Sequence, residues 1–149
     1  MAKGAGSLTL IVFVAVGLVL GYILSNFYSA RGYGVHGQIT AINVSIYKDS
    51  LTLQQLTEID WGTLDPGEAN TTTFYIKSTS NTPITLTYEI SDWQPPAAQT
   101  YLTLSWDYAG TIIQPSAIQQ VKMTLHVSSA VTGIQAFAFN IAIIGVKGA

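Results

Sequence analysis

The chain has 149 residues, no cysteine and a formal net charge of −2, and only 9 % of its residues are charged. The absence of cysteine excludes disulfides and thiolate chemistry, and the lack of a basic surplus excludes a typical nucleic-acid-binding protein. Ordinary soluble domains carry about 25 % charged residues. A surface this weakly charged indicates cover by sugars or by neighbouring subunits.

The first predicted element is a transmembrane-type α-helix within residues 1–30. Its centre, residues 8–24, contains no charged residue, and a helix of roughly 18 apolar residues can cross a bilayer. Three fates stay open for this helix: a removed signal peptide, a retained membrane anchor, or a pilin-type helix that packs in a filament core. Cleavage after Ala30 would put Tyr28 at a position that needs a small residue, which disfavours a signal peptide.

Gly17 and Gly21 form a G-x-x-x-G pair, a pattern that lets two helices approach closely. Self-association through this pair is one interpretation, and the general frequency of glycine in membrane helices is the other. Residues 31–34 contain two further glycines and predict the end of the helix and a short neck.

The rest of the chain, residues 35–149, predicts a β-sandwich head. Its apolar residues recur with period 2, which is typical of strands. The expected strands lie at residues 42–47, 57–61, 73–77, 84–90, 102–107, 111–113, 121–128 and 134–146. Seven or eight short strands without a helical pattern predict an antiparallel, immunoglobulin-like sandwich of two sheets. The last strand is apolar on both faces, which indicates a central strand or one that a partner covers.

Two asparagines are candidate glycosylation sites. Asn43 and Asn70 each begin an Asn-x-Ser/Thr sequence, which accepts N-glycans on an exported protein. Glycans there would also explain how a surface with few charges stays soluble.

Three groups of side chains invite a chemical interpretation, and for each the structural alternative is favoured. The two histidines suggest a metal pair, three acidic residues around one turn suggest calcium, and the three tryptophans suggest a sugar-binding platform. The residues are His36 and His126; Asp60, Asp65 and Glu68; and Trp61, Trp93 and Trp106. No nucleophile motif accompanies them. We therefore predict no catalytic, cofactor-binding or metal site, and no enzyme.

Four stretches of the chain resemble a family of small archaeal surface proteins. They are residues 59–67, 82–86, 92–95 and 104–108. Proteins of that family combine an N-terminal hydrophobic helix with one β-sandwich head, a layout similar to that of archaeal type IV pilins. The resemblance implies a location on the cell surface and this architecture.

These observations predict a structural subunit of an archaeal extracellular filament. Copies of the chain would assemble through the hydrophobic helix, through strand addition, or both, and residues 35–41 and the last strand are the segments expected to complete a neighbour's sheet. The subunit would sit in the membrane at least before assembly, and its partners would be other copies, the membrane and N-glycans. The alternative is a membrane-anchored extracellular domain that acts as an adhesin or as an accessory subunit of a membrane complex.

Overall fold

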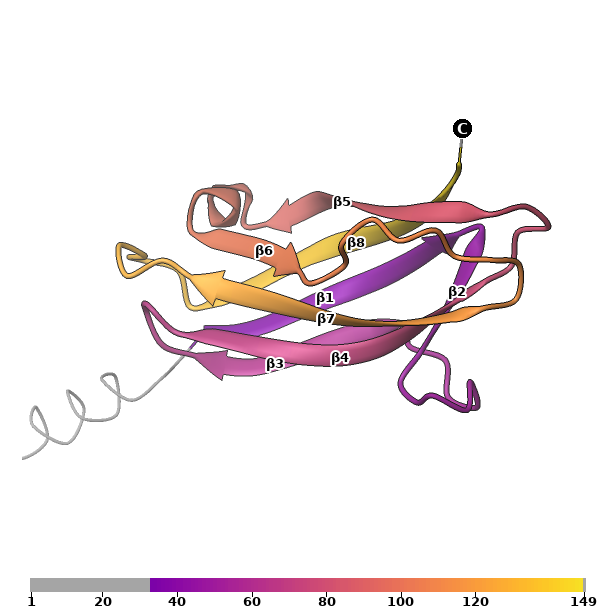
Figure 1. Ribbon diagram of the computed structural model, residues 1–149. Helices are drawn as coiled ribbons and strands as arrows, with labels where there is room; N and C mark the ends of the chain where they lie inside the picture. The colour runs from indigo at the N-terminus through magenta and orange to yellow at the C-terminus, as the bar shows by residue number, and fades with distance from the viewer. Residues whose placement is uncertain (1–32, 149) are drawn as a thin grey trace, which may run out of the picture. The chain divides into compact units, whose positions relative to one another are not determined.

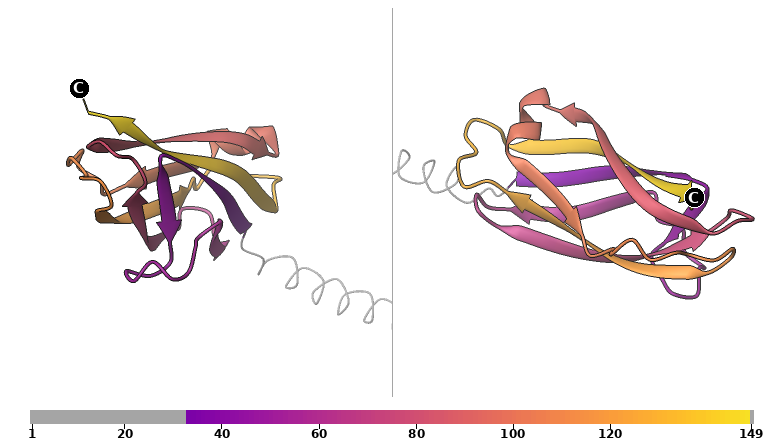
Figure 2. Two further views of the ribbon diagram at one scale, coloured as in Figure 1. Left: turned by 90° about the vertical axis from the view of Figure 1, so that its right-hand side faces the viewer. Right: turned by 45° about the horizontal axis from the view of Figure 1, so that its top comes forward.

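The computed structural model describes residues 33–148, which form two packed β-sheets (Figure 1). Sheet A has the strand order β3-β1-β8-β5 and sheet B the order β2-β4-β7-β6. The elements are β1 (Tyr33–Ile42), β2 (Val44–Tyr47), β3 (Glu58–Leu64), β4 (Ala69–Ser78), β5 (Ile84–Gln94), η1 (Pro96–Thr100), β6 (Leu102–Trp106), β7 (Ile118–Val127) and β8 (Ala136–Lys147). Figure 2 shows the two layers from two further sides. The predicted two-sheet sandwich is therefore confirmed.

The alternating sequence explains why each strand has one buried face. In β7, for example, Val121, Met123 and Leu125 are fully buried, while Lys122 is exposed between them. Successive side chains of a strand point to opposite faces, so the apolar set faces the other sheet. The largest fully buried side chains come from both sheets and fill the space between them: Trp61, Phe74, Phe137 and Phe139.

The predicted fold class is wrong in its helical part. Within residues 33–148 the one helical element is the five-residue 3-10 helix η1. None of the helices in this part of the chain is both long and apolar enough to cross a membrane. The helix predicted for residues 1–30, with Gly17 and Gly21, lies outside the described residues. The described fold is mainly β because its apolar residues follow period 2.

Strand β1 begins earlier than predicted and pairs in an unexpected direction. Tyr33 and Gly34, expected in the neck, are its first residues. It runs antiparallel to β3 but parallel to β8, from the pair Gly34↔Ala136 to the pair Ile42↔Ile144. Sheet A is therefore mixed, and the prediction of a wholly antiparallel sandwich is wrong for this pair of strands.

The two segments expected to complete a neighbour's sheet are both interior strands. Residues 35–41 belong to β1, which lies between β3 and β8, and the last strand, β8, lies between β1 and β5. Residues 34–38 of β1 and residues 140–144 of β8 are paired with a strand on each side. Neither strand is a free edge, and of the two interpretations of the last strand the central one is confirmed.

Candidate functional site

The two sheets meet along two long seams, and tyrosine side chains close the one between β5 and β6. The Tyr88 hydroxyl of β5 donates a hydrogen bond to the main-chain carbonyl of Leu104 in β6, at 2.8 Å. The Tyr108 hydroxyl accepts one from the Leu86 N–H, at 3.2 Å. Trp106 packs edge-on against both tyrosine rings, with ring centroids 4.7 and 5.4 Å apart. We call this the closed seam, because a tyrosine hydroxyl satisfies one main-chain group on each of its two edge strands.

The opposite seam, between β3 and β4, lacks such a closure, and we call it the open seam. Strand β2 pairs only with residues 75–78 of β4, so residues 69–74 pair with β7 alone. At one end of the β4–β7 ladder the Ser78 N–H donates to the Ala117 carbonyl, and at the other end the Val127 N–H donates to the Glu68 carbonyl. By alternation, the main-chain N–H and C=O groups of the even-numbered residues of β4 point toward β7. The N–H and C=O of Thr73 therefore point toward the open seam, and β3 likewise pairs only with β1. Residues 69–74 form a free sheet edge.

A tight loop follows β2 and does not pair with residues 69–74 of β4. The Asp49 carboxylate accepts hydrogen bonds from the main-chain N–H groups of Gln54, at 2.8 Å, and Leu53, at 3.2 Å. The bond from Gln54 is the main cause that lowers the pKa of Asp49. The chain then returns along β2, where Leu56 N–H donates to the Ile46 carbonyl at 2.9 Å. The loop thereby stabilises β2, and Lys48 and Leu56 at its two ends line one hollow with Thr72 and Thr73 of β4.

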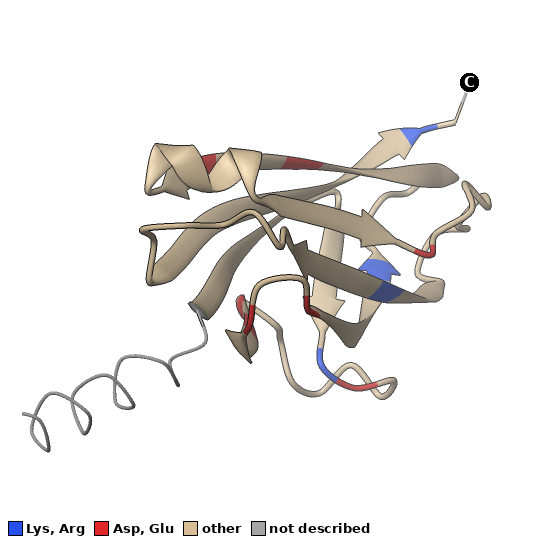
Figure 3. Ribbon diagram, turned by 90° about the vertical axis from the view of Figure 1, so that its left-hand side faces the viewer, with Lys and Arg blue, Asp and Glu red and all other residues tan. Residues whose placement is uncertain are grey.

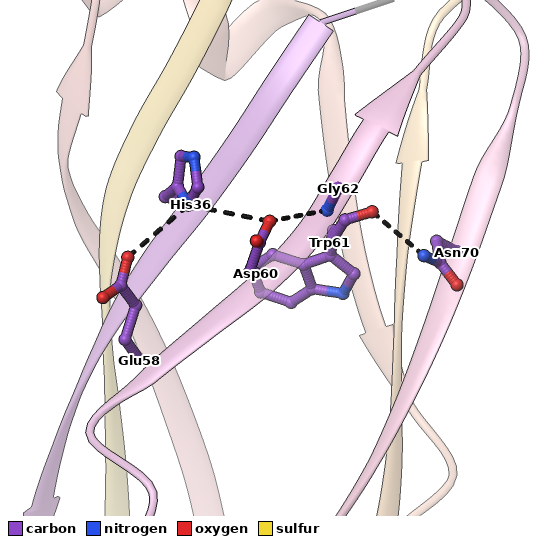
Figure 4. A network of polar contacts seen from close by, with 6 residues as sticks. All are labelled: His36, Glu58, Asp60, Trp61, Gly62 and Asn70. Carbon is purple, nitrogen blue, oxygen red and sulfur yellow. Dashed lines mark hydrogen bonds and ion pairs between the residues drawn. The ribbon is translucent and has the colours of Figure 1, made fainter.

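Charged side chains surround two adjoining hollows along the open seam. The hollows measure about 300 and 440 Å³ and share Lys48, Glu58 and Asp60. The Nδ1 atom of His36 lies 3.5 Å from Glu58 Oε1 and 3.6 Å from Asp60 Oδ1 (Figure 4). All three side chains are more than half exposed, so these contacts contribute little stability. The carboxylates of Glu58 and Asp60 give this part of the surface a negative charge.

One side chain bridges the open seam close to the β3–β4 turn. Asn70 Nδ2 donates to the Trp61 carbonyl at 2.9 Å (Figure 4), and Asn70 Oδ1 accepts from the Thr71 N–H at 2.8 Å. The Asp60 carboxylate accepts from the Gly62 N–H at 2.7 Å. Side-chain hydrogen bonds therefore join β3 to β4 near the turn. Beyond them a hollow separates the two strands beside Thr72 and Thr73.

Two buried polar atoms without a hydrogen-bond partner lie on the strands that border the open seam. They are Nε1 of Trp61 on β3 and Oγ of Ser78 on β4. A buried polar group without a partner costs about 1–3 kcal/mol. Ser78 pairs with Val44 of β2, beyond the free edge, whereas Trp61 belongs to β3, which borders the open seam directly.

Both candidate glycosylation sites lie at exposed positions and hold the main chain. Asn43 turns the chain from sheet A to sheet B with φ of 59°, and its Nδ2 donates to the Gly145 carbonyl at 3.1 Å. Asn70 bridges the open seam through the same atom. A glycan on Nδ2 leaves one N–H, so both bonds are compatible with a sugar. Glycosylation stays a prediction.

The structure brings His36 beside Asp60 but does not assemble either the histidine pair or the acidic group suggested by the sequence. His36 lies on the outer face of sheet A and His126 on that of sheet B. Glu68 accepts a hydrogen bond from the Asp65 N–H at 3.0 Å, as a turn-capping residue does. Within residues 33–148 no group of three or more histidine and acidic side chains is placed to hold a metal ion.

The tryptophans belong to the core and its margin. Trp61 is 1 % exposed and stacks on Phe139 with ring centroids 5.5 Å apart. Trp93 packs on the same ring at 4.8 Å, and Trp106 belongs to the closed seam. They do not form a common platform on the surface for a sugar ring, and the structural interpretation holds.

The open seam was not predicted from the sequence, although one signal for it exists there. The apolar alternation of β2 stops at Tyr47, before the turn-forming Lys48-Asp49-Ser50, whereas its partner β4 continues over residues 69–78. Unequal lengths of neighbouring strands leave part of the longer one unpaired.

The sequence matches no model of a known protein family and no curated protein.

Proposed function

We propose that this chain is a non-enzymatic structural subunit that assembles with copies of itself into a filament on the cell surface. The observation that carries the proposal is the free edge of β4 at residues 69–74. An extended segment of a second copy can pair with such an edge, and the main-chain hydrogen bonds then supply affinity.

The composition of this edge supports the proposal. Edge strands of proteins that stay monomeric are usually guarded by lysine, proline or a bulge. Residues 69–74 read Ala-Asn-Thr-Thr-Thr-Phe and contain neither lysine nor proline. Threonine and phenylalanine also favour strands. The low fraction of charged residues weakens the repulsion that keeps copies apart.

The finer assignments belong to the same proposal. The immunoglobulin-like description rests on two packed, mainly antiparallel sheets. The archaeal origin rests on the resemblance of the four sequence stretches, and glycosylation rests on the exposed Asn43 and Asn70. An adhesin or an accessory subunit, which would work as a single head, is the alternative that the following experiment distinguishes.

Proline substitutions at two neighbouring positions of β4 test the role of the free edge. Thr73→Pro removes an N–H that faces the open seam, so the variant should fold but should no longer form fibres. Thr72→Pro removes an N–H that pairs with β7 and leaves a carbonyl of β7 without its partner, which should cost about 1–3 kcal/mol of the free energy of unfolding. Thermal unfolding measures the fold, and electron microscopy of cell-surface preparations measures the fibres.

Three outcomes are informative. Fibres in the wild type and in Thr73→Val, but not in a folded Thr73→Pro variant, support strand addition at β4. Normal fibres in Thr73→Pro contradict that route. A wild-type chain that stays a monodisperse monomer contradicts the filament and favours a single binding head.

A further inference from the structure

The outer face of sheet A is acidic. Its strands contain four carboxylates, two on β3 and two on β5: Glu58, Asp60, Glu89 and Asp92. Glu58 and Asp60 are exposed and alternate with the buried Ile59 and Trp61, so they point outward. Asp92 Oδ2 accepts a hydrogen bond at 2.7 Å from Asn140.

The basic groups of sheet A do not cancel this charge. His36 lies between Glu58 and Asp60, with its Nδ1 3.5 and 3.6 Å from their carboxylate oxygens, and is one group against four carboxylates. Lys147 is the last residue of β8, and by alternation it lies on the same side as the buried Gly145. Lys48 lines both hollows beside Glu58 and Asp60 and adds one positive charge next to β3, so the four carboxylates still leave this face with a net negative charge.

Small side chains cover the middle of this acidic face. Between the carboxylates of β3 and β5, strand β8 presents Ala138 and Ala142 outward, because the residues on either side of each alanine are buried or face the core. Strand β1 presents Gln38 and Thr40 at the same level. A face of short side chains lets a second sheet approach to about 10 Å, the usual distance between packed sheets.

The outer face of sheet B has the opposite charge. Its strands contain Lys77, Lys122 and His126 and no carboxylate. Lys77 and Lys122 alternate with buried residues and point outward. The nearest acid, Asp107, follows β6, and its Oδ1 accepts a hydrogen bond at 2.7 Å from the Lys122 main-chain N–H. Among the described residues neither lysine forms an ion pair. Figure 3 shows the acidic positions of β5 on one layer and basic strand positions on the other.

We propose that the outer face of sheet B of one copy docks on the outer face of sheet A of the next copy. This contact rests on the proposed function, self-assembly, and gives it a direction. The two faces of one copy differ, so each copy can bind one neighbour on either side. Repetition of such a heterologous contact produces an open chain unless its rotation closes a ring.

The spacing of the charges agrees with this contact. The carboxylates on β3 and those on β5 are separated by three strand spacings, about 14 Å. Lys77 and Lys122 lie on neighbouring strands and are offset by four residues, because Lys77 pairs with Ile118; this offset is also about 14 Å. Each lysine can meet one acidic edge when the strands of the two copies cross at nearly a right angle, one of the two usual packings of sheets.

Ion pairs of this kind are exposed and individually weak, so their main effects are on direction, rate and salt dependence. Salt at 1 M shortens the screening length to about 3 Å and should dissociate this contact. Strand addition at β4 uses main-chain hydrogen bonds and should resist salt. The two modes of association can therefore be measured separately.

Charge reversal tests the contact in the full-length chain, kept in mild detergent and followed by sedimentation velocity at low salt. Lys122→Glu and Glu89→Lys should each weaken self-association at least about tenfold, and an equimolar mixture of the two variants should restore part of it. Lys147→Glu makes the same change of net charge as Lys122→Glu at the end of β8 and should associate as the wild type does.

Each outcome decides either this contact or the filament. Unchanged association in Lys122→Glu and Glu89→Lys, with fibres intact, overturns the contact and leaves the filament. Discrete particles that the reversals dissociate support the contact and contradict the filament. Equal losses in Lys122→Glu and Lys147→Glu would assign the effect to net charge and overturn the contact. A wild-type monomer at every salt concentration overturns both.

Discussion

The two seams of the sandwich both lie between edge strands of the two sheets, but they differ in the side chains that bridge them. At the closed seam, tyrosine hydroxyls from β5 and from the segment after β6 bond to main-chain groups of the facing strand. At the open seam, Asn70 makes one such bridge near the turn, and the remaining edge of β4 has no strand beside it. Aromatic side chains are long enough to reach across a seam and carry a polar end, whereas threonines are not.

This difference indicates which side of the molecule is available for association. A sheet edge whose main-chain groups bond to side chains presents little to a second chain. At residues 69–74 the Thr71 N–H bonds to Asn70 Oδ1, and the N–H and C=O of Thr73 stay available. We therefore expect changes at the closed seam to alter stability alone, and changes at the open seam to alter stability or assembly according to which atoms they affect.

The largest expected effect is at Gly37, behind the open seam. A Cβ atom there would lie 2.8 Å from Cζ3 of Trp61 and 3.3 Å from Cδ1 of Ile141. The indole ring is rigid and buried, so Gly37→Ala should lower the free energy of unfolding by about 1–3 kcal/mol. Gly34→Ala on the same strand is the matched control, because a Cβ there meets nothing within 4 Å. Denaturant unfolding measures both, and equal stabilities would contradict the close packing.

The next effect is at the closed seam. Tyr88→Phe keeps the ring on Trp106 and removes the hydrogen bond to the Leu104 carbonyl, which should cost about 1 kcal/mol. Tyr75→Phe is the control, since the Tyr75 hydroxyl has no hydrogen bond to any residue from 33 to 148. Chemical unfolding should separate the two variants. Fibres should form normally in both, and their loss in Tyr88→Phe would show that assembly also needs the closed seam.

A smaller change of the opposite sign is expected at Ser78, on the strand that borders the open seam. Its hydroxyl is buried without a partner, so Ser78→Ala should raise the free energy of unfolding by up to about 1 kcal/mol. Ser45→Ala on the neighbouring β2, where the side chain is half-buried, should change it little. A clear loss of stability in Ser78→Ala would reveal a partner for the hydroxyl.

The smallest expected effect is a pH dependence at Asp49, which holds the loop beside the open seam. Main-chain hydrogen bonds, first that from Gln54, lower the pKa of Asp49 in the folded chain. A lowered pKa means that its contribution is complete above the unfolded-state pKa of about 4 and is lost as the pH falls through the folded-state value. The stability difference between wild type and Asp49→Asn should therefore shrink below about pH 4.

Asp65→Asn is the control for this pH series. The Asp65 carboxylate accepts no hydrogen bond from residues 33–148, so its stability difference from the wild type should stay small. A difference for Asp49→Asn that stays constant from pH 7 down to pH 2 would contradict the role of its carboxylate in holding the loop.

The sequence by itself determined most strands and the two-sheet architecture. Alternation at residues 73–77, 84–90 and 121–128 predicted β4, β5 and β7, although β4 begins four residues earlier, because period-2 burial is a local property of a chain packed on one face. Local pattern failed at residues 33–42, where glycines suggested a neck and the chain forms β1. It also predicted a strand at residues 111–113, where the structure has a single bridge from Ile113 to Ile84.

Only the tertiary structure decided which strands are edges, and the candidate site depends on that. The parallel pairing of β1 with β8 joins residues about a hundred positions apart, and no local pattern encodes such a partner. That pairing made interior strands of the two segments expected to be free, and it left β3 and β4 at the open seam. Alternation specifies which face of a strand is buried, but the choice of neighbour depends on the packing of the whole chain.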